Sequence, residues 1–224
     1  MQDKSISNLL FIEVFSGTAG LTAEVRRLGC QHSTGVDAHV TKQVKAPVLR
    51  LDLSDESGQA LLWRILQQPR VFAVHLGPPC GTSSRAREIK RRFGPNHVPL
   101  RSDQFPDGLN GLSGRNQARV TTANILYQLS GEIMAYCTMH GIICSLENPA
   151  RSHMWNTSFL CRPLEPVRHM LAEVLFHHCM FGAKRRKSTK LLVNHNCFQH
   201  LSRSCDGSHE HDRWGHPTRV GHCP

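Results

Sequence analysis

The apolar residues of the first third of the chain alternate between short continuous runs and segments with helical spacing. Runs typical of strands buried on both faces lie at 9–15, 33–37, 48–53 and 71–76. Apolar residues recur at helical spacing at 21–28, where Gly29 follows as a stop, and at 57–68. Strands that alternate with helices in this way predict an α/β fold, with a parallel sheet and helices on its faces.

The pattern changes after the fourth strand and then resumes. Residues 85–116 are polar, punctuated by Gly and Pro, and are predicted to form a long loop. The elements predicted beyond this loop are a helix at 117–140, a strand at 141–149, helices at 154–159 and 163–175, and strands at 177–181 and 190–194.

Composition narrows the class of protein. The 224 residues suffice for one domain with a full core. Nine cysteines, an odd number at irregular spacing, do not indicate a disulfide framework and favour a reducing compartment, nucleus or cytoplasm. The first residues resemble no secretory signal, and no apolar run reaches the length of a membrane span. A net charge of +10, with fifteen histidines besides, favours nucleic acid over a membrane as the partner.

Cys80 follows the fourth predicted strand directly after Pro78 and Pro79, which cannot donate to a sheet ladder. Ligands bind beyond the carboxyl ends of strands in open α/β sheets. A thiol at that place is a candidate nucleophile, and the alternative is a buried cysteine in a strand-end turn. Glu147 lies near the end of another predicted strand, so a carboxylate is expected at the same edge.

The first strand leads into a glycine turn, Ser16-Gly-Thr-Ala-Gly20, and then into a helix. Glycines let the backbone approach a ligand, and a helix N-terminus offers unpaired N–H groups, as in nucleotide-binding units. Asp37 ends the second strand, where an acid commonly accepts hydrogen bonds from a ribose, and Asp52 lies at the end of the third. Each acid could instead cap the next element.

Two further segments are rich in groups that bind ligands. The loop after Cys80 carries far more cations than acids, which favours a nucleic-acid contact over a merely solvated charge run. From Cys197 onward the chain is rich in Cys and His. A tetrahedral zinc set of Cys197, Cys205, His209 and His211 is one interpretation, and a loose histidine-rich tail is the other.

Four motifs in order resemble the cytosine-5 DNA methyltransferases, over roughly Phe11 to Asn194. Phe15-Ser-Gly-Thr-Ala-Gly20 resembles their S-adenosylmethionine loop, and Gly77-Pro-Pro-Cys-Gly-Thr-Ser-Ser84 their catalytic segment. Glu147-Asn-Pro149 resembles their acid segment, and Phe181 to Thr189 their basic motif. The resemblance implies a Rossmann-like methyltransferase fold with a catalytic domain at 1–194, a basic loop at 85–116 over the active site, and a Cys/His-rich tail at 195–224.

The resemblance also implies roles for individual residues. Cys80 would add to carbon 6 of a flipped-out cytosine, and Glu147 would hydrogen-bond its ring nitrogen and amine. A cation of the basic motif would hold the carbonyl oxygen of the base, with Lys187 first by position. The implied catalytic set is Cys80, Glu147, Lys187, Arg185 and Ser84. The implied cofactor set, for S-adenosylmethionine, is Phe15, Ser16, Gly17, Thr18, Gly20, Leu21, Asp37, Asp52 and Pro78. The implied nucleic-acid contacts, on DNA or RNA, are Arg85, Arg87, Lys90, Arg91, Arg92 and Arg186.

Departures from the family pattern leave a second interpretation open. The family usually has Gln where this chain has Gly81, Val where it has Pro149, and Gln-x-Arg-x-Arg where it has a Lys/Arg run. Some thirty Cys/His-rich residues follow the basic motif, where family members carry a long recognition region and a final helix. A methyltransferase fold that only binds nucleic acid, as a mobile-element remnant would, fits these departures, and an active chain could use a protein partner for target recognition.

Two other enzyme classes are disfavoured by the residues around Cys80. An amino-group methyltransferase wants an acid or amide before Pro-Pro and an aromatic residue after it, and Gly77 and Cys80 fit neither. A zinc-dependent deaminase needs a second Cys three residues after Cys80, where Ser83 stands.

Overall fold

A computed structural model of the chain describes residues 6–89 and 97–212. One twisted sheet runs through it, made of strands β1 (Leu10–Val14), β2 (Thr34–Asp37), β3 (Val48–Arg50), β4 (Val71–Leu76), β5 (Ile143–Pro149), β6 (Ala172–His177) and β7 (Ser188–Val193). The helices are α1 (Gly20–Arg27), α2 (Glu56–Leu66), α3 (Gly114–Met139) and α4 (Ser158–Leu164). Short 3-10 turns connect several of these elements.

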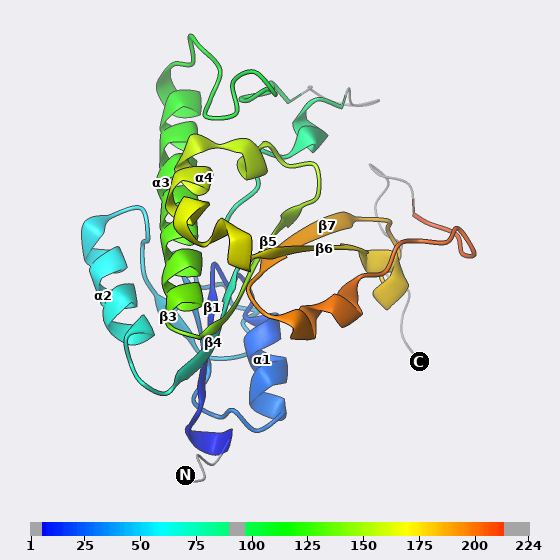
Figure 1. Ribbon diagram of the computed structural model, residues 1–224. Helices are drawn as coiled ribbons and strands as arrows, with labels where there is room; N and C mark the ends of the chain where they lie inside the picture. Colours follow the sequence, from blue (N-terminus) through cyan, green and yellow to red (C-terminus); the bar gives the residue numbers. More distant parts are fainter. Residues whose placement is uncertain (1–5, 90–96, 213–224) are drawn as a thin grey trace.

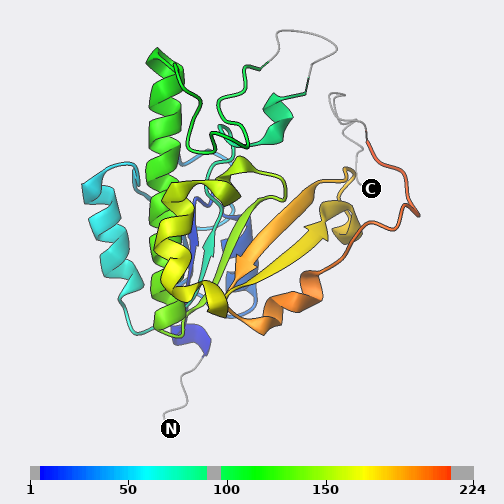
Figure 2. The ribbon, with the colours of Figure 1, turned by 45° about the horizontal axis from the view of Figure 1, so that its top comes forward.

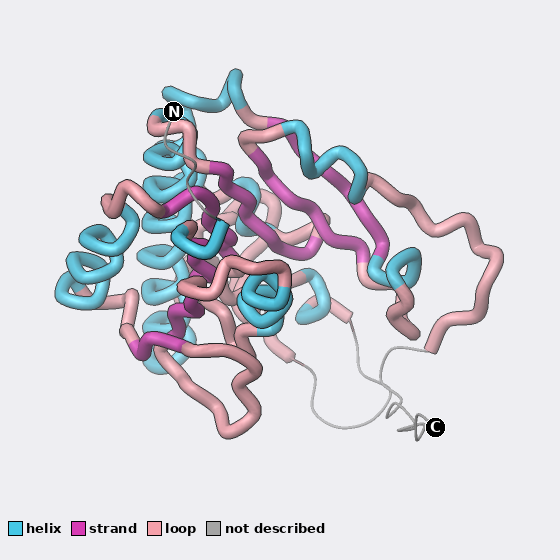
Figure 3. Tube along the Cα trace, turned by 90° about the horizontal axis from the view of Figure 1, so that it is seen from below, coloured by secondary structure: helices cyan, strands magenta, loops and turns pink. Residues whose placement is uncertain are grey.

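The seven strands lie in the order β3-β2-β1-β4-β5-β7-β6. Neighbours from β3 to β5 pair in parallel, whereas β7 is antiparallel to both β5 and β6. The strand order reverses between β1 and β4, because the chain builds outward from β1 to β3 and then returns to the centre. Figure 3 shows the β6–β7 pair at the opposite end of the sheet from β3. The predicted parallel sheet is confirmed, with one antiparallel strand near its end.

Alternation along β1 shows that both faces of the sheet are covered. All five residues of β1 are buried. Leu10, Ile12 and Val14 pack in the main core with Leu62 of α2. Glu13 points to the other face, where its carboxylate accepts hydrogen bonds from the Thr22 backbone N–H and hydroxyl of α1, both at 2.6 Å. Helices α2 and α3 therefore cover one face and α1 the other (Figure 1), and the predicted α/β fold, a mostly parallel sheet with helices on both faces, is confirmed.

The 26-residue helix α3 packs along the sheet and against α4 (Figure 2). Its middle is buried on several sides, including Tyr127, Ile133 and Met134. The two helices approach closely at Gly131, where a Cβ atom would lie 2.9 Å from the Leu160 carbonyl oxygen. A larger side chain at Gly131 would therefore force α4 away from α3.

Two predicted elements beyond residue 150 were wrong. The segment 163–175 was predicted as one helix, but α4 ends at Leu164, a 3-10 turn runs over Glu165–Met170, and β6 begins at Ala172. Pro166 removes a helical N–H in that turn, and Ala172–His177 gains a full ladder with β7. The predicted strand 177–181 contributes only its first residue to β6, since His178–Phe181 forms a 3-10 turn that ends at left-handed Gly182.

The predicted helix at 154–159 is also divided. A 3-10 turn covers His153–Asn156, and α4 begins at Ser158, where the Thr157 hydroxyl caps the Leu160 N–H. None of the helices in the described ranges combines the length and hydropathy needed to cross a membrane.

Candidate active site

The register of the parallel strands brings the candidate residues to one edge of the sheet. Val14 of β1 pairs with both Val36 of β2 and Leu76 of β4, and Leu76 pairs with Leu146 of β5. The segments that follow these positions therefore start side by side: the glycine turn after β1, Asp37, the Pro-Pro-Cys segment and Glu147. The sequence predicted this meeting point, which is the carboxyl edge where ligands bind in α/β sheets.

Two hydrogen bonds to backbone carbonyl oxygens hold the Cys80 segment in place, one from β5 and one from α3. Asn148 Nδ2 donates to the Pro78 carbonyl oxygen at 3.0 Å, and the Tyr127 hydroxyl donates to that of Pro79 at 2.9 Å. Ser83 continues the network, with its Oγ 2.9 Å from the Tyr127 hydroxyl. Because proline has no backbone N–H, its carbonyl oxygen is its only backbone hydrogen-bonding group. The carbonyl oxygens of Pro78 and Pro79 both accept from buried side chains. The thiol of Cys80 is thus held on a rigid support while its side chain stays partly accessible.

Tyr127 and Asn148 were missed as supports by the sequence reasoning. Asn148 had a signal, because it follows Glu147 in the acid segment, but Tyr127 lies 48 residues from the oxygen that it bonds. Asn148 Oδ1 is buried with no hydrogen-bond partner among the described residues. An unsatisfied buried acceptor beside Glu147 marks a place where a ligand donor would be stabilised.

Glu147 and Lys187 meet across the β5–β7 boundary. Lys187 Nζ lies 3.3 Å from Glu147 Oε1, and both side chains remain partly exposed. Burial raises the pKa of the Cys80 thiol, the charge of Lys187 lowers it, and the charge of Glu147 raises it. The three groups therefore interact electrostatically, and Lys187 favours the thiolate that a nucleophile needs.

The charges around Cys80 predict opposite shifts in its reactivity. Lys187→Met removes the cation that stabilises the thiolate, so the pH midpoint for alkylation of Cys80 by iodoacetamide should move upward. Glu147→Gln removes the opposing anion, so the midpoint should move downward. Peptide mass spectrometry across a pH series measures the rate at Cys80 alone. Lys190→Met, which removes the cation paired with Glu173, is the control, and equal midpoints in all four proteins would contradict the electrostatic coupling.

The loop between β1 and α1 holds an unusual backbone. Phe15, Gly17 and Ala19 all have φ between 54° and 61°, and two of them are not glycine. A non-glycine residue in that region costs about 1–2 kcal/mol, and such strain gathers where a loop binds a ligand. Gly17 has open space around its Cα, and Ser16 Oγ is buried with no hydrogen-bond partner in the described ranges.

Asp37 lies directly against this loop. Its carboxylate accepts hydrogen bonds from the Gly17 N–H at 2.8 Å and the His39 N–H at 2.9 Å. Asp52 lies two residues beyond β3 and accepts from the Ser54 N–H and hydroxyl, which lower its pKa. Leu21 is 42% exposed at the start of α1, and Pro78 is buried. Thr18 and Gly20 complete the turn. The predicted cofactor residues therefore lie in one region, except Asp52, whose hydrogen bonds stay within its own turn.

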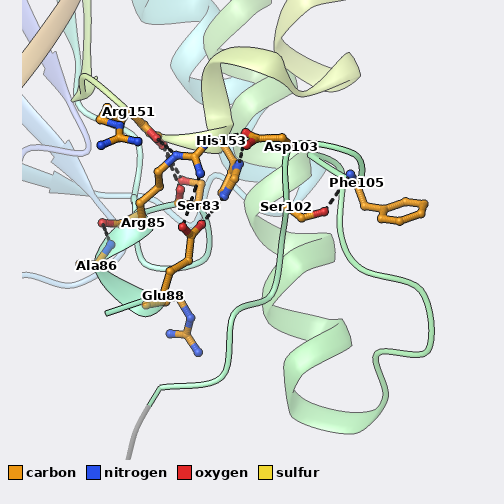
Figure 4. Close-up of polar contacts among 12 residues, drawn as sticks. Ser83, Arg85, Ala86, Glu88, Ser102, Asp103, Phe105, Arg151 and His153 are labelled. Atoms are coloured by element: carbon orange, nitrogen blue, oxygen red, sulfur yellow. Dashed lines mark hydrogen bonds and ion pairs between the residues drawn. The ribbon is translucent and has the colours of Figure 1, made fainter. Parts of the chain in front are cut away.

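An ion network anchors the segment after Cys80 to the strand-end turn after β5 (Figure 4). Arg85 pairs with Asp103 and with Glu88, the latter at 3.4 Å. The other oxygen of Glu88 lies 2.7 Å from Nε2 of the buried His153. The His153 N–H donates to the Ser83 carbonyl oxygen at 2.9 Å, which links this network to the Cys80 support. The network fixes the start of the basic loop beside the candidate nucleophile.

The residues predicted to contact nucleic acid differ in their exposure and in the hydrogen bonds and ion pairs that they make within the chain. Arg85 is held in the ion network, and Arg87 donates to the Val98 and Gly81 carbonyl oxygens. Arg186 is exposed, and Lys90, Arg91 and Arg92 lie outside the described residues. Arg119 of α3, which is not among the predicted nucleic-acid contacts, reaches within 3.9 Å of the Cβ position of Gly81 and is exposed.

Ser84 and Arg101 have structural roles in this region. The Ser84 hydroxyl accepts from the Ala86 N–H and caps the 3-10 turn at Arg85–Arg87. Arg101 is 2% exposed and donates to the Thr82 hydroxyl and the Pro106 carbonyl oxygen. Both residues stabilise the loop from inside, and the exposed cations remain the candidates for a nucleic-acid contact.

His75 is a half-buried base in β4, the strand that leads to the candidate site. Its Nδ1 lies 2.8 Å from the Ser145 Oγ of β5. Burial lowers its pKa from 6.5 to about 4, although the charge of Glu147 opposes that shift. The imidazole is therefore neutral at pH 7.

The neutral state of His75 predicts a pH-dependent stability. The folded state binds its proton more weakly than the unfolded state, so the contribution is present above pH 6.5 and is lost as the pH falls toward about 4. The loss should reach about 3 kcal/mol. Urea unfolding at several pH values should give a flatter stability profile for His75→Gln than for the wild type. Parallel profiles would contradict the assignment.

The predicted zinc set is corrected by the structure. Cys205, His209 and His211 lie together, but their fourth neighbour is Cys179, and not Cys197. Cys197 is exposed in the 3-10 turn at Asn196–Leu201, which contacts β6, and it does not belong to that cluster. The sequence could not reveal Cys179, because the β6 pairing that brings it to the tail is a long-range contact.

Comparison of the sequence with protein-family models and with curated proteins finds no match. Among solved structures, the chain is similar to the methyltransferase EhMeth of Entamoeba histolytica, with a TM-score of 0.49, 12% identity, and coverage of 83% of this chain and 52% of that one. It is also similar to a mutant of Spodoptera frugiperda DNMT2 (TM-score 0.47, 12% identity, 84% and 51%). For the S. pombe Dnmt2 methyltransferase the values are 0.45, 15%, 89% and 58%. The chain thus spans about half the length of these proteins, and the similarity concerns the backbone alone.

Proposed function

We propose that this chain is an S-adenosylmethionine-dependent DNA cytosine-5 methyltransferase. The observation that carries the proposal is the meeting of Cys80, Glu147 and Lys187 at the carboxyl edge of the sheet, beside the strained loop after β1. A nucleophile, an acid and a cation that interact across three strand ends form a set suited to attack on an electron-poor ring.

Cys80 acts as the nucleophile. Its thiolate forms a bond to carbon 6 of cytosine, and the electron pair of the 5,6 double bond makes carbon 5 nucleophilic. S-adenosylmethionine, held by the residues of the loop after β1, would supply the electrophilic methyl group for carbon 5, with the neutral thioether as the leaving group. A base then removes the carbon 5 proton, the double bond re-forms, and the bond from carbon 6 to Cys80 breaks to return the thiolate.

Glu147 and Lys187 stabilise the charge that this attack creates. Glu147 hydrogen-bonds ring nitrogen 3 and the exocyclic amine, so that electron density added to the ring is neutralised. Lys187 lies against the same carboxylate, from which it can hold the carbonyl oxygen of the base and favour the thiolate. Arg185, whose carbonyl oxygen accepts from the Lys187 N–H, belongs to the same turn.

The residues of the loop after β1 fit S-adenosylmethionine. The left-handed backbone and the open space at Gly17 allow the cofactor to approach the loop closely. The exposed Leu21 offers it an apolar surface. Ser16 Oγ, which has no hydrogen-bond partner among the described residues, offers it a polar contact. Asp37 is held in place by two backbone N–H groups and keeps acceptor capacity for ribose hydroxyls. Asp52 would bind the adenine amine, and Pro78 would pack against the cofactor.

A nucleic acid is the proposed substrate because the segment after Cys80 is cationic, and DNA is proposed because the motifs resemble those of the DNA cytosine-5 methyltransferases. A stacked cytosine cannot reach a thiol on a rigid strand end, so the base is flipped out or single-stranded. In this proposal the basic loop at 85–116 covers the flipped base within a catalytic domain at 1–194, and the exposed Arg119 and Arg186 contact the phosphates. Lys90, Arg91 and Arg92, which lie outside the described residues, would add further phosphate contacts.

Nucleoside mass spectrometry tests the proposal. The chain is incubated with S-adenosylmethionine bearing a deuterated methyl group and with matched DNA and RNA oligonucleotides. Label in 5-methyldeoxycytidine is the expected result. Label only in 5-methylcytidine of RNA would show that RNA is the substrate. Label on an exocyclic amine would overturn the proposed chemistry. DNA binding without any label would favour a protein that binds nucleic acid without methylating it.

A further inference from the structure

We infer that Cys179, Cys205, His209 and His211 form a structural zinc site that fastens the C-terminal segment 203–212 to the turn that carries Lys187. Cys179 lies in the 3-10 turn after β6, and the other three lie within seven residues of the C-terminal segment. One potential ligand atom from each residue lies within 4.8 Å of all the others. The inference stands apart from the catalytic chemistry, since no member of the set belongs to the candidate active site.

The separations fit a tetrahedral metal. With Zn–S of about 2.3 Å and Zn–N of about 2.0–2.1 Å, the S to N edge of a tetrahedron is about 3.5–3.6 Å. Cys205 Sγ lies 3.5 Å from His211 Nε2 and 3.9 Å from His209 Nε2. Two thiolates and two imidazoles are a donor set typical of zinc.

The surrounding residues orient two of the ligands. Asp206 Oδ1 lies 3.9 Å from His209 Nδ1, on the far side of the ring from the cluster. A carboxylate beside the second imidazole nitrogen is a common outer partner of a zinc-bound histidine. Asp206 is itself held by the N–H and hydroxyl of Ser208, and Gly207, with φ of 77°, turns the chain so that Cys205 and His209 face the same point.

Few contacts other than the cluster hold segment 203–212 against the rest of the described structure. The small core beneath it consists of Val174, Leu191 and Val193, with Phe176, Phe198 and Leu201 packed on it, and none of these lies beyond Leu201. Segment 203–212 contains no apolar residue of that core. It meets β6 through an isolated bridge between Phe176 and Arg203 and through a hydrogen bond from the Cys205 N–H to His177 Nδ1 at 2.7 Å. A structural metal commonly stabilises a segment where the apolar core is too small to hold it in place.

The site would also fix the turn that carries Lys187. The orange-red segment passes beside the short turn after β6 in Figure 1. The Asp212 N–H donates to the Lys184 carbonyl oxygen at 2.9 Å, and the His178 N–H donates to that of Lys187 at 3.0 Å. Both ends of the basic turn are therefore tied to residues next to metal ligands.

A disulfide between Cys179 and Cys205 is the competing arrangement, because the two sulfur atoms are close enough to interact. It would leave the convergence of two imidazole nitrogens and Asp206 unexplained. The donor set therefore favours metal over oxidation.

Metal analysis of the full chain tests the site. Wild-type protein purified with zinc should hold about one equivalent, and Cys179→Ser and His211→Gln should lose it. Cys197→Ser is the matched control and should retain it. Zinc retained by Cys179→Ser, zinc lost from Cys197→Ser, or a Cys179–Cys205 disulfide in zinc-free wild type would each overturn the inference.

A second measurement on the wild type needs no variant to fold. Cobalt(II) exchanged into the protein should give the intense visible absorption of a tetrahedral site with thiolate-to-metal charge transfer. Removal of the metal by a chelator should speed hydrogen exchange at the Lys187, Cys205 and Asp212 amides by at least about tenfold, while α3 amides stay unchanged. A weak octahedral cobalt spectrum, or unchanged exchange at those amides, would contradict the site.

Discussion

Cys80→Ala is expected to abolish methyl transfer to cytosine, with a loss of at least about a thousandfold in rate. The substitution removes the one thiol of segment 77–84 and leaves the hydrogen bonds of that segment in place, because they bind the Pro78 and Pro79 carbonyl oxygens. The fold should persist for the same reason. Transfer of labelled methyl to DNA measures the rate, and binding of S-adenosylmethionine by calorimetry should be retained.

Cys161→Ala is the matched control for this loss. Cys161 is also partly buried, and burial also raises its thiol pKa, but it lies in α4 with its Sγ 3.4 Å from the Trp155 carbonyl oxygen. Its substitution should leave methyl transfer within about twofold of the wild type. Activity that survives in Cys80→Ala would show that transfer proceeds without the proposed adduct.

Glu147→Gln is expected to slow methyl transfer by about a hundred- to a thousandfold. The amide keeps the shape of the carboxylate but cannot neutralise the charge that builds on the ring. The same substitution lowers the pKa of Cys80, because the charge of Glu147 raises it. Loss of turnover in a protein with a more reactive thiol would separate the role of the acid from that of the nucleophile.

Glu173→Gln provides a control with the same chemistry. Glu173 pairs with Lys190 at 2.8 Å across the β6–β7 ladder, as Glu147 pairs with Lys187 across β5 and β7. Loss of a surface ion pair costs little, so this variant should keep its rate. Equal slowing in the two variants would mean that the Glu147 effect is structural.

The parallel half of the fold could be predicted because its signals are local. Each strand from β1 to β5 is a short apolar run, and the register of parallel strands then brings Cys80 and Glu147 to one edge without any knowledge of side-chain packing. The glycine turn was visible as well. Its strained φ at Phe15 and Ala19 was not, because neither residue type favours that conformation.

The antiparallel end of the sheet could not be predicted from local pattern. Ala172–His177 contains residues that suit a helix as well as a strand, and its pairing with β7 decides the outcome. The contact of β6 with the C-terminal segment, between Phe176 and Arg203, then brings Cys179 to that segment, so the Cys/His cluster depends on a contact that sequence spacing does not encode. The Tyr127 support of the Pro79 carbonyl oxygen was missed for a similar reason, since it joins the middle of α3 to the end of β4.

Trapping on fluorinated DNA tests the central claim most directly. In an oligonucleotide with 5-fluorocytosine, fluorine cannot leave carbon 5 as the proton does, so the bond from Cys80 to carbon 6 persists after methyl transfer. Mass spectrometry of the wild type with S-adenosylmethionine should show a protein–DNA adduct whose cross-linked peptide contains Cys80, and Cys80→Ala should show none. An adduct at another residue, or methylated product from the unfluorinated DNA with no adduct on the fluorinated one, would contradict the proposed mechanism.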